Sequence, residues 1–228
     1  MKFNLSLDDF SPHSNAGIAF ESIKWCNKLI EAYPDIKIDL FIPAAYCRLG
    51  EEPCFIKNYP EWVDKVKMLP SNYRINIHGL YHRRSKIDFK WHSGHDSNNN
   101  EWEHLSYQQA GNLLNIIDTE FSLAGMKYHK VFRPPGWYLG AAAAKLLTDR
   151  GFVIAGDKNH YGKLSGQINS LRWVSYNWDL ISEVPAGDIF AFGHTSTWTN
   201  NYIDESKFRL ILDVLNSRDF VFKFIGEL

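Results

Sequence analysis

The chain has 228 residues, of which 45% are hydrophobic, and its 25 Lys and Arg residues nearly balance its 26 Asp and Glu residues. This composition is typical of a globular protein with a sizeable buried core, and it excludes a disordered chain. The net charge of -1, with no basic run beyond Arg83-Arg84, argues against a nucleic-acid partner. We therefore expect one folded domain over residues 1–228.

The three cysteines, Cys26, Cys47 and Cys54, are an odd number without Cys-x-x-Cys spacing. They fit neither a disulfide framework nor a zinc knuckle. Met1 leads directly into a predicted strand, which leaves no room for a signal peptide, and no apolar run is long enough to span a membrane. We expect a cytoplasmic protein with reduced cysteines.

The hydrophobic pattern predicts strands that alternate with helices along the whole chain. Strands are expected at residues 2–7, 36–43, 73–77, 131–132, 152–155, 171–176, 188–192 and 220–225, and helices at 15–33, 60–69, 106–123, 141–150 and 204–217. This alternation predicts an α/β fold with a mostly parallel sheet. With about seven or eight strands, we predict a β/α barrel, regular or distorted, and not an open doubly wound sheet.

Four predicted strands end in stretches that are rich in catalytic residue types: Asp8-Asp9, His78 to His82, Arg133 to Gly136, and His194. In α/β barrels the loops that leave the carboxyl ends of the strands build the active site. We therefore expect these stretches, which lie far apart in the sequence, to converge on one face of the protein.

Two of these stretches together predict a metal site. Adjacent carboxylates repel, so Asp8 and Asp9 are tolerated together mainly where a positive charge neutralises one of them. A divalent metal would do so and would leave the other aspartate free to act as a base. His78 and His82 stand close enough in the sequence to share that metal, and an Asp-His-His set with open positions suits catalytic zinc.

Each pattern also has a simpler interpretation. The aspartate pair is compatible with a solvated strand end at which Asp9 or Ser11 caps the next helix. A chain with nine histidines contains such pairs by chance. His92 and His95 form one of them, which we interpret as part of a solvated turn within the long polar loop 83–104.

The order of the four stretches resembles the polysaccharide deacetylase family, which has the NodB homology fold and includes family 4 carbohydrate esterases. The family's Thr-Phe-Asp-Asp-Gly is similar to Ser-Leu-Asp-Asp-Phe at 6–10, its Arg-x-Pro-Tyr to Arg-Pro-Pro-Gly at 133–136, and its Leu-x-His to Phe-Gly-His at 192–194. His-Gly-x-x-His at 78–82 is similar to the histidine motif of the more divergent deacetylase-like branches of the family. The resemblance covers essentially the whole chain and implies a NodB-like distorted barrel.

The resemblance also implies a role for each matched residue. Asp9, His78 and His82 would bind the metal, and Asp8 would be the general base that takes a proton from the attacking water. Arg133 would hold Asp8 ionised and oriented.

The remaining roles concern the leaving group and the oxyanion. His194 would be the general acid that protonates the departing amine, and the backbone N–H of Gly136 would bind the oxyanion. The family's Asp-x-x-Asp-Trp motif, which supplies the partner of this histidine, has no clean match. If its Trp is Trp178, three alternatives stay open: Asp179 has taken over, Asn177 makes a weaker contact, or His194 lacks support.

Two expectations concern the aromatic residues near the site. Phe10 replaces the family's usual Gly and is expected to narrow the site entrance. Trp137 and Trp178 are expected to stack on sugar faces, whereas core or loop packing is expected for Trp91, Trp102 and Trp198.

The leading hypothesis is a hydrolase that uses zinc or another divalent metal to remove an N-acetyl or other acyl group from an amino sugar. Because no export signal is evident, nucleotide-linked, lipid-linked or oligosaccharide precursors of polysaccharide biosynthesis are the favoured substrates. Two alternatives remain: a hydrolase of a non-sugar amide with the same site, and a catalytically silent carbohydrate-binding module. The presence of Asp8 favours catalysis, since a silent module does not need an unliganded carboxylate beside its metal.

Overall fold

The computed structural model describes residues 1–13, 19–47, 52–82, 101–196 and 199–228. The strands are β1 (Lys2–Asp8), β2 (Ile38–Ile42), β3 (Ala45–Tyr46), β4 (Cys54–Phe55), β5 (Tyr73–Ile77), β6 (Val131–Phe132), β7 (Val153–Gly156), β8 (Trp173–Ser175), β9 (Ile189–His194) and β10 (Val221–Phe222). The α-helices are α1 (Ala19–Ala32), α2 (Pro60–Lys67), α3 (Tyr107–Leu123), α4 (Ala141–Asp149), α5 (Lys158–Leu164) and α6 (Glu205–Ser217). Within these described ranges there are also three 3-10 turns: η2 (Ile56–Asn58), η3 (Pro135–Trp137) and η4 (Ile225–Glu227).

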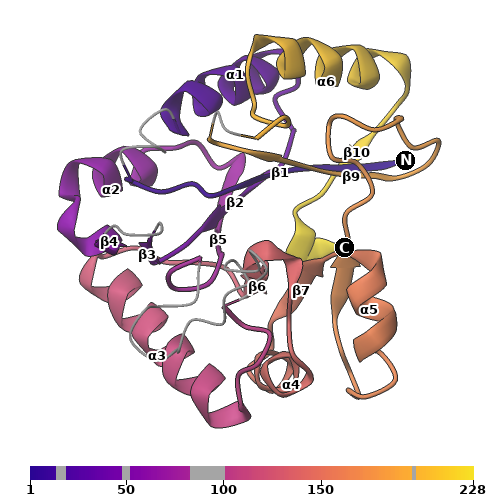
Figure 1. The fold of residues 1–228 in the computed structure, drawn as a ribbon. Coiled ribbons are helices and arrows are strands. Elements are labelled where there is room, and N and C mark those ends of the chain that lie inside the picture. Colours follow the sequence, from indigo (N-terminus) through magenta and orange to yellow (C-terminus); the bar gives the residue numbers. More distant parts are fainter. Residues whose placement is uncertain (14–18, 48–51, 83–100, 197–198) are drawn as a thin grey trace.

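Eight of these strands form one parallel sheet that curls into a half-barrel, with helices on its outer side (Figure 1), and β3 and β4 form a separate antiparallel pair. From β1 the sheet runs through β2, β5, β6 and β7 to β8, and β9 pairs with β1 along its whole length. A single bridge between Trp178 and Ala191 then connects the chain after β8 to β9. β10 pairs with the first two residues of β1. The predicted distorted β/α barrel is confirmed.

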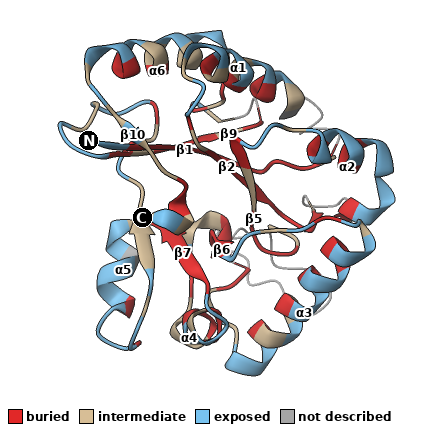
Figure 2. Ribbon diagram, turned by 180° about the vertical axis from the view of Figure 1, so that it is seen from behind, coloured by how far each residue is buried: buried red, intermediate tan, exposed pale blue. Residues whose placement is uncertain are grey.

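The burial pattern follows from the strands being covered on both faces. Every residue of β2 and of β7 is buried, as expected for parallel strands between layers. Figure 2 shows the contrast between these buried strands and the exposed outer faces of the helices. α1 packs beside α6 through the rings of Trp25 and Phe208, whose centroids are 5.6 Å apart.

Helix α3 begins where the sequence predicts it. The Ser106 side chain accepts a hydrogen bond from the backbone N–H of Gln109, and the Gln109 side chain accepts one from the backbone N–H of Ser106. This capping box satisfies two of the N–H groups that a helix start leaves unpaired. In the described ranges, none of the helices combines the length and hydropathy that a bilayer-spanning helix requires.

Three features differ from the sequence-based expectations. The hairpin of β3 and β4 and the short helix α5 occur where no element is predicted, because two-residue strands and a mostly exposed helix leave no hydrophobic period. Phe10 does not narrow a site entrance, since it is fully buried and packs against Phe20 and Trp62.

Most of the long polar loop, together with Trp91, Trp198 and the His92–His95 pair, lies outside the described residues.

Candidate metal centre and catalytic site

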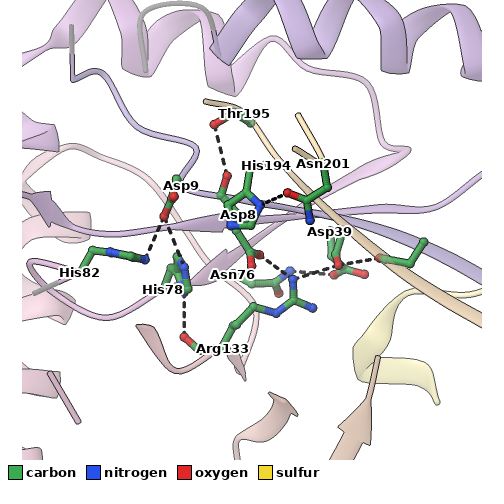
Figure 3. A network of polar contacts seen from close by, with 12 residues as sticks. Asp8, Asp9, Asp39, Asn76, His78, His82, Arg133, His194, Thr195 and Asn201 are labelled. Carbon is green, nitrogen blue, oxygen red and sulfur yellow. Dashed lines mark hydrogen bonds and ion pairs between the residues drawn. The ribbon is translucent and has the colours of Figure 1, made fainter. Parts of the chain in front are cut away.

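Asp9, His78 and His82 lie together beyond the carboxyl ends of β1 and β5 (Figure 3). Oδ1 of Asp9 is 3.5 Å from Nε2 of His78 and 3.1 Å from Nε2 of His82. Two ligand atoms bound to one tetrahedral zinc ion at its usual bond lengths are about 3.4 Å apart. Oδ1 of Asp9 is buried and lacks a hydrogen bond of good geometry, although both imidazoles face it. A divalent cation between the three atoms would satisfy this oxygen, so the donor set fits the predicted metal.

The orientation of the donors is set by their neighbours. Nδ1 of His78 lies 2.9 Å from the carbonyl oxygen of Arg133, so Nδ1–H donates there and Nε2 is the ring nitrogen that faces Asp9. The ring of Tyr46 packs against the ring of His82 at 5.6 Å between centroids. The backbone of Asp9 and of His82 is left-handed, with φ angles of 61° and 64°. Residues other than glycine adopt this conformation at a cost in free energy, and such residues cluster at functional sites.

The electrostatics of Asp9 and His82 suit metal binding. Burial opposes ionisation of Asp9, but the His82 and His78 imidazoles outweigh it and hold the pKa of Asp9 below its ordinary range. Burial lowers the pKa of His82 to about 4, against the attraction of Asp9. Burial lowers the pKa of His78, but the contact with Asp9, the charge of Asp8 and the carbonyl of Arg133 together outweigh it and raise the pKa. At neutral pH an anionic Asp9 and a neutral His82 are the forms that bind metals.

Asp8 is the last residue of β1 and forms a buried ion pair with Arg133. Nη1 of Arg133 is 2.5 Å from Oδ1 of Asp8 and 3.0 Å from Oγ of Ser6, and both charged side chains are 2% exposed. The guanidinium carbon lies 4.0 Å from the ring centre of Phe41 and 5.0 Å from that of Trp137. Arg133 therefore neutralises Asp8 and fixes its orientation, while Asp8 stays outside the metal-donor set.

Another buried carboxylate, that of Asp39, supports the interior of the half-barrel. Asp39 accepts hydrogen bonds from the side-chain amides of Asn4 and Asn76, each at 2.7 Å, and from the backbone N–H of Ile225 at 2.9 Å. Burial raises its pKa, against these hydrogen bonds and the attraction of Arg133. This network ties β1, β2 and β5 to the C-terminal segment.

His194 ends β9 and has a side-chain partner that the sequence does not reveal. Its Nδ1 lies 2.7 Å from Oδ1 of Asn201. Because a carboxamide oxygen only accepts, Nδ1–H donates to Asn201 and Nε2 is not engaged by this contact. The backbone holds the same pair, since the N–H of His194 donates to the carbonyl of Asn201 at 3.1 Å. Asn201 is 6% exposed, so this contact is shielded from water.

None of the candidates near the expected Asp-x-x-Asp-Trp motif supports His194. The side chain of Asn177 instead bonds the carbonyl of Asp188 and the N–H of Phe190. Oδ1 of Asp179 accepts the N–H groups of Ile181 and Ser182, within its own turn. The alternatives in which Asp179 or Asn177 supports His194 are therefore wrong, because both side chains are bound to the backbone of their own neighbourhood. The third alternative, a histidine without support, is not met either, because Asn201 contacts it.

Trp178 is not a surface for sugar stacking. Its side chain is fully buried, and its indole N–H donates to the carbonyl of Ser182 at 3.2 Å. Since the ring has no exposed face, the predicted substrate contact is wrong, and Trp178 is a core residue. Trp102 is fully buried as well, which confirms its predicted packing role.

Gly136 and Trp137 border the Arg133–Asp8 pair. Both have positive φ, 61° and 69°, so the chain turns sharply here. The half-buried ring of Trp137 contacts Tyr176 and Phe192, with centroid distances of 4.4 and 4.8 Å. The N–H of Trp137 donates to the carbonyl of Pro134, which leaves the N–H of Gly136 as the candidate oxyanion donor.

No protein-family model and no curated protein sequence matches the chain. Solved structures of family 4 carbohydrate esterases have a similar fold. A family 4 acetyl xylan esterase from Clostridium thermocellum, in complex with a cobalt ion, has a TM-score of 0.54 and 13% identity over 100% of this chain and 89% of that chain. The peptidoglycan N-acetylglucosamine deacetylase Bc1960 has a TM-score of 0.52 and 13% identity, over 97% of this chain and 85% of that chain. A family 4 pseudoenzyme from Bacillus anthracis has a TM-score of 0.56 and 11% identity, over 99% of this chain and 64% of that chain. The chain has the fold of the family 4 carbohydrate esterases, as its motifs predict.

Proposed function

We propose that the chain is a metal-dependent hydrolase that removes an N-acyl group, such as acetyl, from an amino sugar. One observation carries this proposal: Asp8, paired with Arg133, lies beside the Asp9-His78-His82 donor set without belonging to it. A structural metal site needs no free carboxylate next to its ligands, whereas hydrolysis needs a base at that position.

The residues divide the proton transfers of amide hydrolysis between two sides of the site. When bound, a divalent ion supplies a Lewis acid for the acyl oxygen and for the attacking water. Asp8 accepts a proton from the water as its oxygen bonds to the acyl carbon, and Arg133 keeps the carboxylate oriented. The N–H of Gly136 binds the developing oxyanion. His194 gives a proton from Nε2 to the nitrogen as the C–N bond breaks, so an amine and a carboxylic acid leave.

The fold does not by itself establish catalysis, since one structure with this fold is a pseudoenzyme. The proposal therefore depends on Asp8 and His194. We infer the substrate class from two proteins of similar structure whose names specify acetylated carbohydrates. One is an acetyl xylan esterase and the other is a peptidoglycan N-acetylglucosamine deacetylase. Trp137 borders the site with a half-buried ring and is our candidate for contact with the sugar.

The test is a deacetylation screen with protein loaded with Zn²⁺ or Co²⁺. Free, nucleotide-linked and oligosaccharide forms of N-acetylated amino sugars are incubated with the chain, and released acetate and new primary amines are measured. Acetate release that Asp8→Asn abolishes supports the proposal. A metal-loaded, folded chain that cleaves non-sugar amides and no acylated sugar would instead support the alternative substrate class, and one that cleaves neither would be a silent module.

A further inference from the structure

We propose that Glu101 is a positioning residue for the metal site: its buried carboxylate fixes the loop that carries His78 and His82. The inference rests on the proposed metal-binding role of these histidines. Glu101 does not touch the metal donors, and it acts through the backbone between them.

Glu101 binds two consecutive N–H groups in the middle of this loop. Its Oε2 accepts the N–H of Leu80 at 3.0 Å, and its Oε1 accepts the N–H of Tyr81 at 3.0 Å. Glu101 is 7% exposed and Leu80 is fully buried, so water cannot readily replace these bonds. Without the carboxylate, two largely buried donors would lose their acceptors, which costs about 1–3 kcal/mol for each group.

The other edge of the loop is held by main chain. The N–H groups of Ala44, Ala45 and Cys47 donate to the carbonyls of residues 79, 80 and 81, at 3.2, 2.7 and 3.0 Å. One edge is therefore fixed by the segment that follows β2, and on the other the Glu101 carboxylate binds two N–H groups. Removal of that side chain frees the loop to tilt about its fixed edge, which would change the distance between the two histidine nitrogens.

The loop is shaped to admit the carboxylate. Gly79 has a φ of 75°, and a Cβ atom there would lie 2.5 Å from Oε2 of Glu101 and 2.6 Å from Cγ of Pro135. Any side chain at this position would displace either the carboxylate or the stretch that carries Arg133. The glycine is therefore required by the close approach of Glu101 as well as by its backbone conformation.

Glu101 also links the histidine loop to the stretch around Arg133, the residue that pairs with Asp8. The indole N–H of the next residue, Trp102, donates to Oε2 at 3.2 Å. The Trp102 ring packs on Phe132, with centroids 4.6 Å apart, and its carbonyl accepts the N–H of Gly140. Burial raises the pKa of Glu101 to about 7, against the hydrogen bonds from Tyr81 and Leu80. The three converging donors offset part of the cost of burying this carboxylate.

The test measures metal affinity in Glu101→Gln and Glu101→Ala, with Glu120→Gln as the matched control. Glu120 is also a buried carboxylate, 4% exposed, but it lies on α3 and pairs with Lys57 at 2.8 Å. Co²⁺ is titrated and followed by its visible absorption, and Zn²⁺ affinity is measured by competition with a chelator. Unfolding by denaturant reports the stability of each variant.

We expect Glu101→Gln to weaken metal binding by at least ~10-fold, the usual effect of losing an outer support of a metal site. Glu101→Ala should weaken it further, because Gln retains one acceptor oxygen and Ala retains none. Glu120→Gln should lose stability and keep the wild-type affinity.

Wild-type affinity in Glu101→Gln, with a loss of stability like that of the control, would assign Glu101 a merely structural role. That result would overturn this inference and leave the proposed function intact. A wild-type chain that binds no Co²⁺ or Zn²⁺ would overturn both. If Glu101→Ala does not fold, the metal affinity of Glu101→Gln alone decides between the two roles.

Discussion

Asp8 and His194 are the last residues of β1 and β9 and are register partners across these two parallel strands. Neighbouring strands are about 4.8 Å apart, so the sheet itself sets the separation of the two backbones. Thr195 strengthens the junction, because its N–H and its hydroxyl both donate to the carbonyl of Asp8 at 3.2 Å. The proposed base and acid are thus held by the sheet rather than by flexible loops.

The first prediction concerns Asp8 as the base. Asp8→Asn keeps the shape of the side chain and removes its charge, so the rate should fall at least ~100-fold, the usual contribution of a positioned base. Metal content should stay at the wild-type level, because Asp8 does not belong to the donor set. Turnover and metal analysis on the same preparation test this. Loss of the metal along with activity would show that Asp8 is a ligand.

The second prediction concerns His194 as the acid. His194→Ala should lose a similar factor on an N-acetyl substrate, because an amine leaves poorly until it is protonated. The loss should be much smaller on an activated acetyl ester, whose leaving group departs without a proton. Rates of wild type and variant on both substrates give the comparison. An equal loss on the two substrates would mean that His194 does not act as the acid.

The candidate site residues that the structure brings together share one property. Asp8, Asp9, His78, Arg133 and His194 all directly end or follow strands, and parallel strands bring their carboxyl ends to one edge of a barrel. Hydrophobic periodicity locates such strands, so the residues at their ends can be predicted to meet. The capping box of α3 is predictable for a similar reason, because its hydrogen bonds join residues three apart.

The residues that sequence reasoning misses lie in irregular segments, outside the helices and strands. Asn201 follows His194 by seven residues, and nothing distinguishes it from its neighbour Asn200 until the chain folds back. Glu101 bonds a loop about twenty residues earlier, with no motif to connect them. Trp178 shows the opposite error, since a large aromatic ring near a predicted site is often simply part of the core.

The third prediction concerns the buried ion pair of Arg133 and Asp8. Arg133→Met should lower the free energy of unfolding by about 3–5 kcal/mol, because it leaves a buried carboxylate without its partner. Combining it with Asp8→Asn should recover part of this loss, since the uncompensated charge is then gone. Denaturant unfolding of the four proteins gives the coupling energy. Strict additivity of the two changes would show that the pair does not stabilise the fold.

The fourth prediction concerns the metal. Chelation should abolish hydrolysis, and Zn²⁺ or Co²⁺ should restore it, with about one ion bound per chain. His78→Ala combined with His82→Ala should empty the site. His104→Ala is the control, since its side chain is 63% exposed and belongs to no donor set of the described residues. Full metal loading of the double variant would show that the ligands are misassigned.

The last prediction concerns Asn201, whose side-chain amide contacts His194, the proposed acid. Asn201→Ala removes the acceptor for Nδ1–H of His194, so the ring is free to rotate and both tautomers become available. The turnover number should fall on amides and change little on an activated ester, while the KM for the amide stays close to wild type.

Asn201→Asp tests the same contact in the opposite direction. A carboxylate accepts the same hydrogen bond as the amide and adds a negative charge, which stabilises the protonated imidazole. Because the acid must carry its proton at the start of the reaction, the alkaline limb of the pH–rate profile should move to higher pH than in wild type. The comparison needs the amide substrate, since the ester does not depend on the acid. If neither Asn201→Ala nor Asn201→Asp changes the alkaline limb or the amide rate, the 2.7 Å contact orients the backbone turn and not the acid.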